Sequence, residues 1–454
     1  MGVGWSRWIL AGLLAVVLGA LATPSPVAAQ VDPGLTAAER EALEQEQRDL
    51  FQRMLADPAD LDTTFAYARV STRLGDIEAA ITALERMLIL APDLPRVKLE
   101  LGVLYYRLES YDIARAYLED AIAGEDVPDA VRERVEVFLG EIEDRQARHA
   151  LDLTATGGVR YQTNANLGPA SRDVTIRGFE LELRPEDTEQ EDVNLFAALG
   201  ADYRYDLESQ GDAIEASAIA YATRQFEQHQ VDSEVIEVSV GPRFDLRRFG
   251  LAAASVSPYA LANHIRLDRE GYLVSLGGGV EGDVVVADPL RLEAGLEARW
   301  RDFLDTDTSP LNSQRDGWRY SARTAATWRL TPRLALLAEF DADRVDARAA
   351  YESAWSIGGG GGFRLLIDPP IGVLPWRASA TGAYRYTRYD EPDPFITADE
   401  RQRDREIVLR AALAVPLARD VDVGAQVERR SRTSNYDIEA FDNIAVTAAL
   451  TVRF

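Results

Sequence analysis

An apolar period of two residues, sustained from residue 151 to the end of the chain, restricts the possible folds more than any other feature of this sequence. The stretch "WRYSARTAATWRL" at 318–330 places Trp, Tyr, Ala and Leu at alternate positions, and between them lie Arg319, Arg323 and Arg329. The stretch "VNLFAALGADYRY" at 193–205 has the same pattern. Each segment therefore has one apolar and one polar face, as expected of a β-strand between two different environments.

Strand length and aromatic position distinguish a membrane barrel from a soluble sandwich, whose strands also alternate. The alternating runs extend over roughly a dozen residues, whereas ordinary strands have about 5–6 and a membrane-crossing strand needs about 9–11. Aromatic residues stand near the ends of the runs, for example Trp318, Trp328, Trp376 and Tyr386. This arrangement predicts aromatic girdles at two membrane interfaces, with the apolar face toward lipid and the charged face toward a water-filled lumen.

The runs predict a transmembrane antiparallel β-barrel of about 14 strands over residues 151–454. The predicted strands are 151–163, 191–207, 212–226, 233–247, 250–264, 271–287, 289–303, 316–330, 332–345, 351–367, 374–388, 403–417, 419–431 and 441–454. Tight connections such as "RRFG" and "ARD" alternate with long, mostly acidic ones at 164–191, 304–315 and 390–402. Because short turns face the periplasm in outer-membrane barrels, we expect the N-terminal domain and Phe454 in the periplasm.

The closing stretch "NIAVTAALTVRF" has a structural and a targeting interpretation. Its alternation predicts a last strand that pairs with the first, because an unpaired strand edge is too costly in hydrocarbon. An alternating strand with the aromatic Phe454 at its end also resembles the signal that the outer-membrane barrel-assembly machinery reads in its clients. We therefore expect that machinery to be a partner of this protein.

The N-terminal segment, residues 1–29, resembles a secretory signal peptide. It has a short start with Arg7, an apolar run too short to span a bilayer, and small residues Val27 and Ala29 before the expected cleavage point. An uncleaved anchor is the alternative. The chain has no cysteine, so the fold must hold without disulfides and lipidation of an N-terminal cysteine is impossible.

Residues 30–150 predict a tetratricopeptide-repeat domain. Residues 61–94 align with residues 95–128 at an offset of 34, which is the period of this repeat. The equivalent positions include Ala80 with Ala114, Leu84 with Leu118, and Met87 with Ala121. Such a stack usually binds peptide segments or other proteins in its groove, and the alternative is a spacer or a plug for the barrel. Tyr105 and Tyr106 are candidates for the groove, although helical spacing favours a core position for one of them.

No residue set predicts catalysis, and we expect no enzyme, no cofactor and no metal site. His149 lies at a helix end, His229 in a loop, and His264 at a strand end far from Ser255 and Ser257. The stretch "DTDTSP" at 305–310 begins like a calcium loop, but it has proline where the glycine turn is needed and lacks the later glutamate. It is therefore interpreted as a solvated acidic loop, with divalent ions bridging to lipopolysaccharide as the alternative.

Two features of the barrel interior have open interpretations. The glycine run at 358–362, followed by Phe363, lies in a strand without a following Lys-Ser or Lys-Thr, which argues against a phosphate cradle. It indicates a strand bend or, alternatively, space for a passing chain. The predicted lumen charges form either a selectivity lining or mutually paired ions that fill the interior. These charges are Arg291, Glu293, Glu297, Arg299, Arg301, Arg319 and Arg323.

The overall α + β order of signal, short repeat domain and barrel resembles the surface lipoprotein assembly modifier family. Local support comes from "YQTNAN" at 161–166, similar to the family's Tyr-Asp-Ser-Asn-x-Asn stretch, and from Ser434-Asn435 before the final strand. Gln162 and Thr163 depart from the more common Asp-Ser. The resemblance implies translocation of lipoproteins or related protein cargo to the cell surface, with the repeats engaging cargo or a periplasmic chaperone and the barrel giving the path.

Other functions also fit these features. An outer-membrane pore for small solutes or polysaccharide, whose repeats bind assembly partners, is the main alternative, and a structural adhesin is the third. The formal net charge of −26 argues against a nucleic-acid partner, which would need a clustered basic face. Membrane lipid and lipopolysaccharide are expected partners of the barrel wall.

Overall fold

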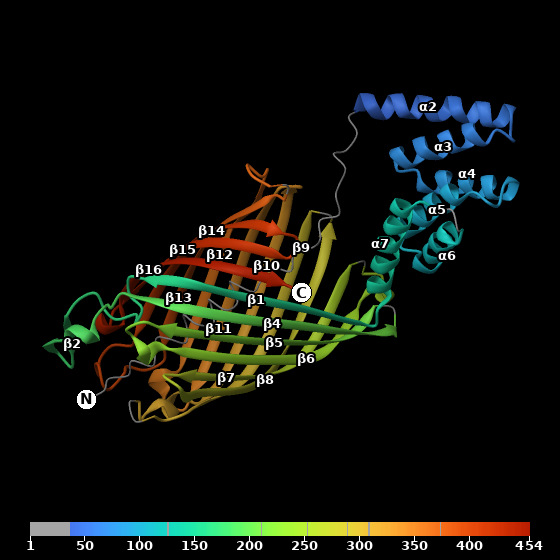
Figure 1. The fold of residues 1–454 in the computed structure, drawn as a ribbon. Helices are drawn as coiled ribbons and strands as arrows, with labels where there is room; N and C mark the ends of the chain where they lie inside the picture. Colours follow the sequence, from blue (N-terminus) through green and yellow to red (C-terminus); the bar gives the residue numbers. More distant parts are fainter. Residues whose placement is uncertain are drawn as a thin grey trace. The chain divides into compact units, whose positions relative to one another are not determined.

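A computed structural model describes residues 37–124, 127–209, 211–251, 253–287, 289–306, 309–372 and 374–454. The predicted signal peptide lies outside these residues. The chain divides into a helical unit and a barrel unit between Ala147 and Arg148 (Figure 1). Each unit is described separately.

The helical unit contains six described helices. They are α2 (Ala37–Ala56), α3 (Leu61–Leu74), α4 (Ile77–Leu90), α5 (Pro95–Arg107), α6 (Tyr111–Ile122) and α7 (Asp129–Gln146). Each helix packs against the next one in the sequence. In the described residues, none of the helices is both long enough and apolar enough to cross a membrane.

Local signals in the sequence set the helix ends. Asp60 caps α3 by accepting a hydrogen bond from the backbone N–H of Thr63 at 3.0 Å. The Thr63 hydroxyl also donates to Asp60, and these bonds hold the pKa of the Asp60 carboxyl below its usual range. Helix α3 ends at Gly75, whose φ of 82° is the left-handed conformation that glycine adopts without strain. Pro95 begins α5, where a missing N–H costs nothing.

The predicted 34-residue repeat is confirmed by the packing of α3–α4 and α5–α6. The equivalent pairs Ala80 and Ala114, and Leu84 and Leu118, are all at most 2% exposed. Gly102, equivalent to Ala68, is also buried and lies directly against Leu118. Small residues thus occur where the two helices of each repeat approach most closely, as the sequence predicts.

One repeat lacks the glycine that ends the first helix of the other. Glu109 lies 34 residues after Gly75 and adopts the same left-handed conformation, with φ of 59°. Because a side chain is strained there, Glu109→Gly is expected to stabilise the helical unit by about 0.5–1 kcal/mol. Urea unfolding of the full chain, followed by circular dichroism of the helices, would measure it. Gly75→Ala should shift the same transition in the opposite direction, and destabilisation by Glu109→Gly would contradict the prediction.

The barrel unit is a closed antiparallel sheet of fourteen strands in the order β1-β16-β15-β14-β13-β12-β11-β10-β9-β8-β7-β6-β5-β4, which confirms the predicted fold. Its strands are β1 (His149–Gln162), β4 (Asp192–Ser209), β5 (Asp212–Gln225), β6 (Ser233–Asp245), β7 (Ala254–Leu267), β8 (Glu270–Ala287), β9 (Leu290–Phe303), β10 (Gly317–Thr331), β11 (Leu334–Ala347), β12 (Ala354–Ile367), β13 (Trp376–Tyr389), β14 (Arg403–Ala418), β15 (Val421–Ser434) and β16 (Phe441–Arg453). The first and last strands pair from Thr154 with Arg453 to Gln162 with Ala445, so the predicted seam is also confirmed.

The side chains alternate between two faces of the closed sheet. On the outer face, large apolar residues stay exposed: Leu199 is 59% exposed, and Leu276 and Leu296 are 60% exposed. The intervening residues, such as Asp202 and Glu297, point into the barrel. A continuous apolar outer wall is stable only where lipid covers it.

The two ends of the barrel differ in their connections. Turns at one end are short, as between β14 and β15. The first residue of β1 and the last residue of β16 also lie at this end. The other end carries long connections, including one with an additional hairpin of β2 (Asp173–Ile176) and β3 (Phe179–Glu182), visible beyond the strand ends in Figure 1. Residues 164–191 were predicted to be a long connection, and this hairpin lies within them. Its turn residues Arg177 and Gly178 both have positive φ, as a tight two-residue hairpin requires.

Candidate functional site

The candidate site is the lumen, whose inner wall has two chemically different sides. From β8 to β15, every strand places at least one arginine or carboxylate side chain at an inward position. From β4 to β7, several of them are large and apolar. The strand register places the two sides on the same closed surface.

Ion pairs organise the charged side. Asp343 on β11 is 5% exposed and accepts from Arg319 at 2.8 Å, from Arg385 at 2.9 Å and from Ser321 at 2.7 Å. Further around the wall, the Glu406 carboxylate binds two neighbouring arginines of β15, Arg430 at 2.9 Å and Arg432 at 2.8 Å. The Asp343 centre joins three strands, β10, β11 and β13, and the Glu406 centre joins the neighbouring strands β14 and β15, so both crosslink the wall.

The predicted lumen charges are paired, with one exception. Arg291, Glu293, Glu297, Arg299, Arg319 and Arg323 each lie in an ion pair with a residue of the same wall. This confirms the paired-ion interpretation for those six residues. Arg301 differs because its guanidinium stacks over Phe303 at 5.3 Å and, among the described residues, its buried Nε has no hydrogen-bond partner.

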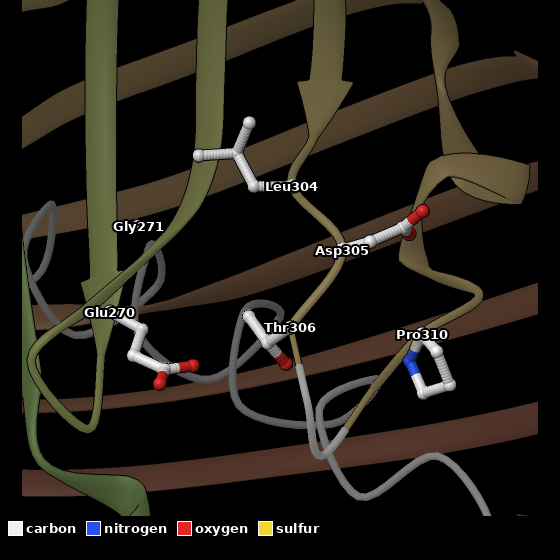
Figure 2. A pocket seen from close by; sticks show the side chains of 6 residues that line it. All are labelled: Glu270, Gly271, Leu304, Asp305, Thr306 and Pro310. Carbon is white, nitrogen blue, oxygen red and sulfur yellow. The ribbon is translucent and has the colours of Figure 1, made fainter.

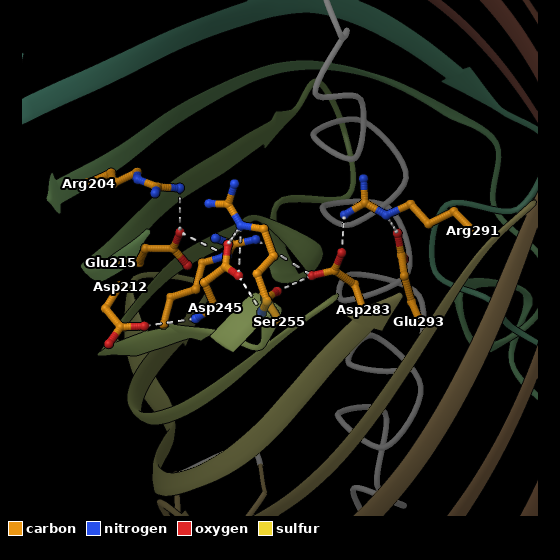
Figure 3. A network of polar contacts seen from close by, with 10 residues as sticks. Arg204, Asp212, Glu215, Asp245, Ser255, Asp283, Arg291 and Glu293 are labelled. Carbon is orange, nitrogen blue, oxygen red and sulfur yellow. Dashed lines mark hydrogen bonds and ion pairs between the residues drawn. The ribbon is translucent and has the colours of Figure 1, made fainter. Parts of the chain in front are cut away.

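A second polar network lies inside the barrel toward the short turns (Figure 3). Asp283 of β8 is at its centre: Arg291 reaches its carboxylate at 3.3 Å, Arg243 at 3.9 Å, and the Ser255 hydroxyl also donates to it. Glu215 links the network to Arg204 of β4 at 3.7 Å. The network therefore spans β4 to β9 and gives the entrance on this side a mixed-charge lining.

The apolar side of the lumen contains a packed cluster. Phe196, Tyr221, Val235 and Ile265 point inward from β4, β5, β6 and β7 and are at most 7% exposed. The Arg160 guanidinium lies over the Phe196 ring at 4.9 Å and shields it. This cluster was not predicted from the sequence, because in segments such as "AIAYAT" both faces carry small or apolar residues and the alternation gives no contrast.

The asparagines of "YQTNAN" hold the chain as it leaves β1. Asn164 is fully buried; its Nδ2 donates to the carbonyl of Gly168 at 2.8 Å and to that of Asp442 at 3.1 Å. Asn166, 2% exposed, donates to the Thr188 carbonyl at 2.7 Å. These amides join the two ends of the long connection, so the motif has a structural role at the barrel mouth.

The other stretch of the resemblance also fixes a loop. Asn435 Oδ1 accepts from the backbone N–H of Arg403 at 2.7 Å, and its Nδ2 donates to the Arg401 carbonyl at 3.1 Å. Tyr436 donates its hydroxyl to the Glu400 carbonyl at 2.6 Å. The β13–β14 and β15–β16 connections are thereby joined.

The β2–β3 hairpin joins the same group of connections. The backbone N–H of Arg177 donates to the carbonyl of Ile396 at 2.7 Å, and its guanidinium donates to the carbonyl of Pro394 at 2.8 Å. Thr175 donates its N–H to the Asp437 carboxylate at 3.3 Å. Three long connections thus form one bonded collar at this end of the barrel.

The predicted histidine and serine positions do not form a common site. His149 Nδ1 lies 2.6 Å from the Tyr203 hydroxyl, and His229 Nδ1 is 4.0 Å from Asp232. On β7, His264 and Ser255 occupy positions of opposite parity and face opposite sides of the sheet. In the searched part of the chain, no group of three or more acidic or histidine side chains is placed to hold a metal ion.

The acidic loop after β9 borders a cavity of about 720 Å³, lined by Glu270, Gly271, Leu304, Asp305, Thr306 and Pro310 (Figure 2). Asp305 accepts from both the N–H and the hydroxyl of Ser313, at 2.8 and 3.0 Å, so its carboxylate closes the loop. Asp307 and Thr308 of the "DTDTSP" stretch lie outside the described residues.

The glycine run of β12 makes room for acidic side chains in the lumen. A Cβ at Gly358 would lie 2.6 Å from the Asp341 carboxylate, and one at Gly360 would lie 3.1 Å from Glu339. β12 keeps a continuous register with both neighbouring strands through the run. The strand bend and the space for a passing chain stay predictions.

In the helical unit, both tyrosines of the predicted groove pack between helices. The Tyr105 hydroxyl donates to Glu85 at 2.6 Å, and this bond, together with burial, raises the pKa of Tyr105 to about 12. Its ring stacks on Tyr117 at 5.6 Å. Tyr106 donates to Glu141 of α7 at 2.7 Å. Both residues thus link successive repeats.

A closed, even-numbered antiparallel barrel with an apolar exterior and a charged interior defines a transmembrane barrel of the outer-membrane type, here preceded by tetratricopeptide-like repeats. No protein-family model and no curated protein matches the sequence.

Similar solved structures exist for each unit. The helical unit is similar to the Yersinia enterocolitica type III secretion chaperone SycD in complex with a peptide of the translocator YopD, at 14% identity and a TM-score of 0.22 over 24% of this chain and 86% of that chain. The barrel is similar to a bacterial polysaccharide outer membrane secretin, at 11% identity and TM-score 0.36 over 68% and 100% of the two chains. It is also similar to the outer membrane channel DcaP of Acinetobacter baumannii, at 8% identity and TM-score 0.38 over 67% and 97%. These similarities concern the fold and extend no further.

Proposed function

We propose that this protein is an outer-membrane translocator that delivers specific lipoproteins or related protein cargo to the cell surface. The repeats engage the cargo or its periplasmic chaperone, and the barrel gives the path. The resemblance to surface lipoprotein assembly modifiers supports this proposal, and so does the combination of a repeat scaffold with a membrane barrel in one chain.

The observation that carries the proposal is the mixed chemistry of the lumen. A polypeptide presents apolar and charged side chains in turn, and it needs a wall that accommodates both. The inward cluster around Phe196 and Tyr221 is the apolar part of the wall and is covered by the Arg160 side chain, while the Asp343 and Glu406 centres supply charge on other strands.

The proposal is tested by comparing the surface proteome of cells with and without this protein, using protease shaving and mass spectrometry. Loss of one or two surface proteins that remain in whole-cell lysate is the expected result. A sharper version compares Val235→Asn, in the apolar cluster, with Ala325→Asn on the charged side of the lumen. Only the first should reduce cargo at the surface, and heat-modifiable migration on gels checks that both barrels fold. An unchanged surface proteome would contradict the proposal.

A second candidate function is a pore for small solutes or polysaccharide. The mixed-charge network around Asp283 favours it, because such a lining suits a soluble polar substrate. Altered solute uptake or capsule export in cells without the protein, with an unchanged surface proteome, would favour this alternative.

A further inference from the structure

In the strands that the structure describes, the outer wall carries a row of arginines at one end of the barrel and none at the other. The register aligns Arg344 of β11 with Trp355 of β12, Trp355 with Arg388 of β13, and Arg388 with Arg403 of β14. Arg405 faces outward from the next position of the same face, opposite Tyr386. Arg388, Arg403 and Arg405 are exposed, and Trp355 is 57% exposed.

The same four strands have no such charge at their other end. The outward row near the short turns consists of Leu334, Leu365, Ala378 and Leu413, in continuous register. An arginine on the lipid face costs about 2–4 kcal/mol at the bilayer midplane but almost nothing at the interface. The arginine row therefore marks an interface with one leaflet, the one adjoining the long connections.

Arginines elsewhere on the outer wall already have protein partners. Arg266 binds Glu234 at 2.8 Å, and Arg429 binds Asp442 at 2.6 Å. In the row itself, Arg344 binds Asp390 at 2.7 Å and lies 3.6 Å from Asp346, and Arg403 lies 3.9 Å from Glu400.

Arg388 and Arg405 differ from these residues. Among the residues that the structure describes, neither has a carboxylate within ion-pair distance. Two exposed guanidinium groups thus remain available on neighbouring strands.

A groove on the lipid-facing wall begins beside this row. Its volume is about 610 Å³, and Gly278, Ala298 and Ala322 form a floor of small residues between the larger side chains of Leu296 and Tyr320. Arg344 and Trp355 belong both to the groove and to the row. The surface therefore combines an apolar channel along the wall with positive charge at its interfacial end.

We propose that this surface binds a phosphorylated, multiply acylated glycolipid, the lipid A part of lipopolysaccharide. Arg388 and Arg405 bind its phosphates, since the planar guanidinium forms paired hydrogen bonds with phosphate oxygens. The groove takes an acyl chain, and Trp355 lies at the boundary between chain and headgroup. This proposal rests on the proposed orientation of the barrel in the outer membrane, in which the long connections face the cell surface.

The test is a titration of the full-length protein in detergent with bisphosphorylated lipid A, read by native mass spectrometry. Arg388→Ala with Arg405→Ala should weaken binding about tenfold, the loss expected for two charge-assisted contacts at an exposed site. Arg333→Ala with Arg419→Ala removes the same charge from the short turns at the other end and should leave binding unchanged. Ala342→Phe, which fills the groove, should weaken binding without changing any charge.

Two binding results would overturn the proposal: equal weakening by both arginine pairs, or equally tight binding of phosphatidylglycerol. Orientation is tested separately, because the chain has no cysteine and single ones can be introduced. Ala398→Cys, in the β13–β14 connection, should react with an impermeant maleimide on intact cells, and Arg419→Cys only after permeabilisation. The reverse labelling pattern would also overturn the lipid A proposal. The surface-proteome comparison tests cargo translocation independently of this result.

Discussion

Glu406→Gln is expected to lower the free energy of unfolding of the barrel by about 3 kcal/mol, because it leaves two buried arginines without their shared counter-charge. The side chains of Arg430 and Arg432 are 7% and 10% exposed, and that of Glu406 is 13% exposed. Glutamine keeps the size of the side chain, so the effect reports charge rather than a cavity. Urea unfolding in lipid vesicles, followed by tryptophan fluorescence, measures the loss.

The matched control for this prediction is Asp368→Asn. Asp368 binds Arg333 at 2.6 Å, but their side chains are 73% and 62% exposed. An exposed pair contributes less than about 1 kcal/mol, so the control should remain close to the unaltered protein. If both variants unfold at the same urea concentration, the Glu406 centre does not stabilise the barrel as argued.

Gly102→Ala is expected to destabilise the helical unit by about 1–3 kcal/mol through overpacking. A Cβ at Gly102 would lie 2.6 Å from Leu118 Cγ and 3.3 Å from the Ala114 carbonyl. Leu118 is fully buried, so it can yield only if its packed neighbours move too, and α5 and α6 are expected to separate. Circular dichroism of the helices during urea unfolding of the full chain measures the change.

The substitution Gly140→Ala should instead stabilise the helical unit. Gly140 lies within α7, and a Cβ there would meet no atom of the described residues within 4 Å. Alanine in an open helical position is favoured over glycine by about 0.8–1 kcal/mol. A stabilised Gly140→Ala beside a destabilised Gly102→Ala would separate close packing from helix propensity, and equal effects would contradict the packing argument.

The barrel was largely predictable because its pattern is long and repetitive. Predicted and observed strands agree closely: the run 290–303 was expected at 289–303, and β16 at 441–454 is observed as Phe441–Arg453. Membrane lipid imposes the alternation on every strand, so each strand gives independent evidence for the same fold. The helical repeat was predictable for a similar reason. Ala80 and Ala114 occupy equivalent positions in the two repeats, and close helix packing requires a small residue at each of them.

The site was less predictable because it depends on which strands become neighbours. The two arginines of the Glu406 centre lie on β15, well separated in sequence from the carboxylate they share. The arginine row joins Arg344 to Arg403 only after four strands are set in register. The "YQTNAN" stretch was recognised, but its role in holding Gly168 and Asp442 depends on the closure of β1 with β16.

The collar at the long-loop end is held to a large extent through main-chain carbonyls. Arg177 binds the carbonyls of Ile396 and Pro394, Tyr436 that of Glu400, and Asn435 that of Arg401. A carbonyl acceptor is the same whichever residue supplies it, so the accepting positions can change identity while the connections keep their shape. If this end faces the outside, antibodies and phages meet a surface whose side chains are free to diversify on a constant backbone.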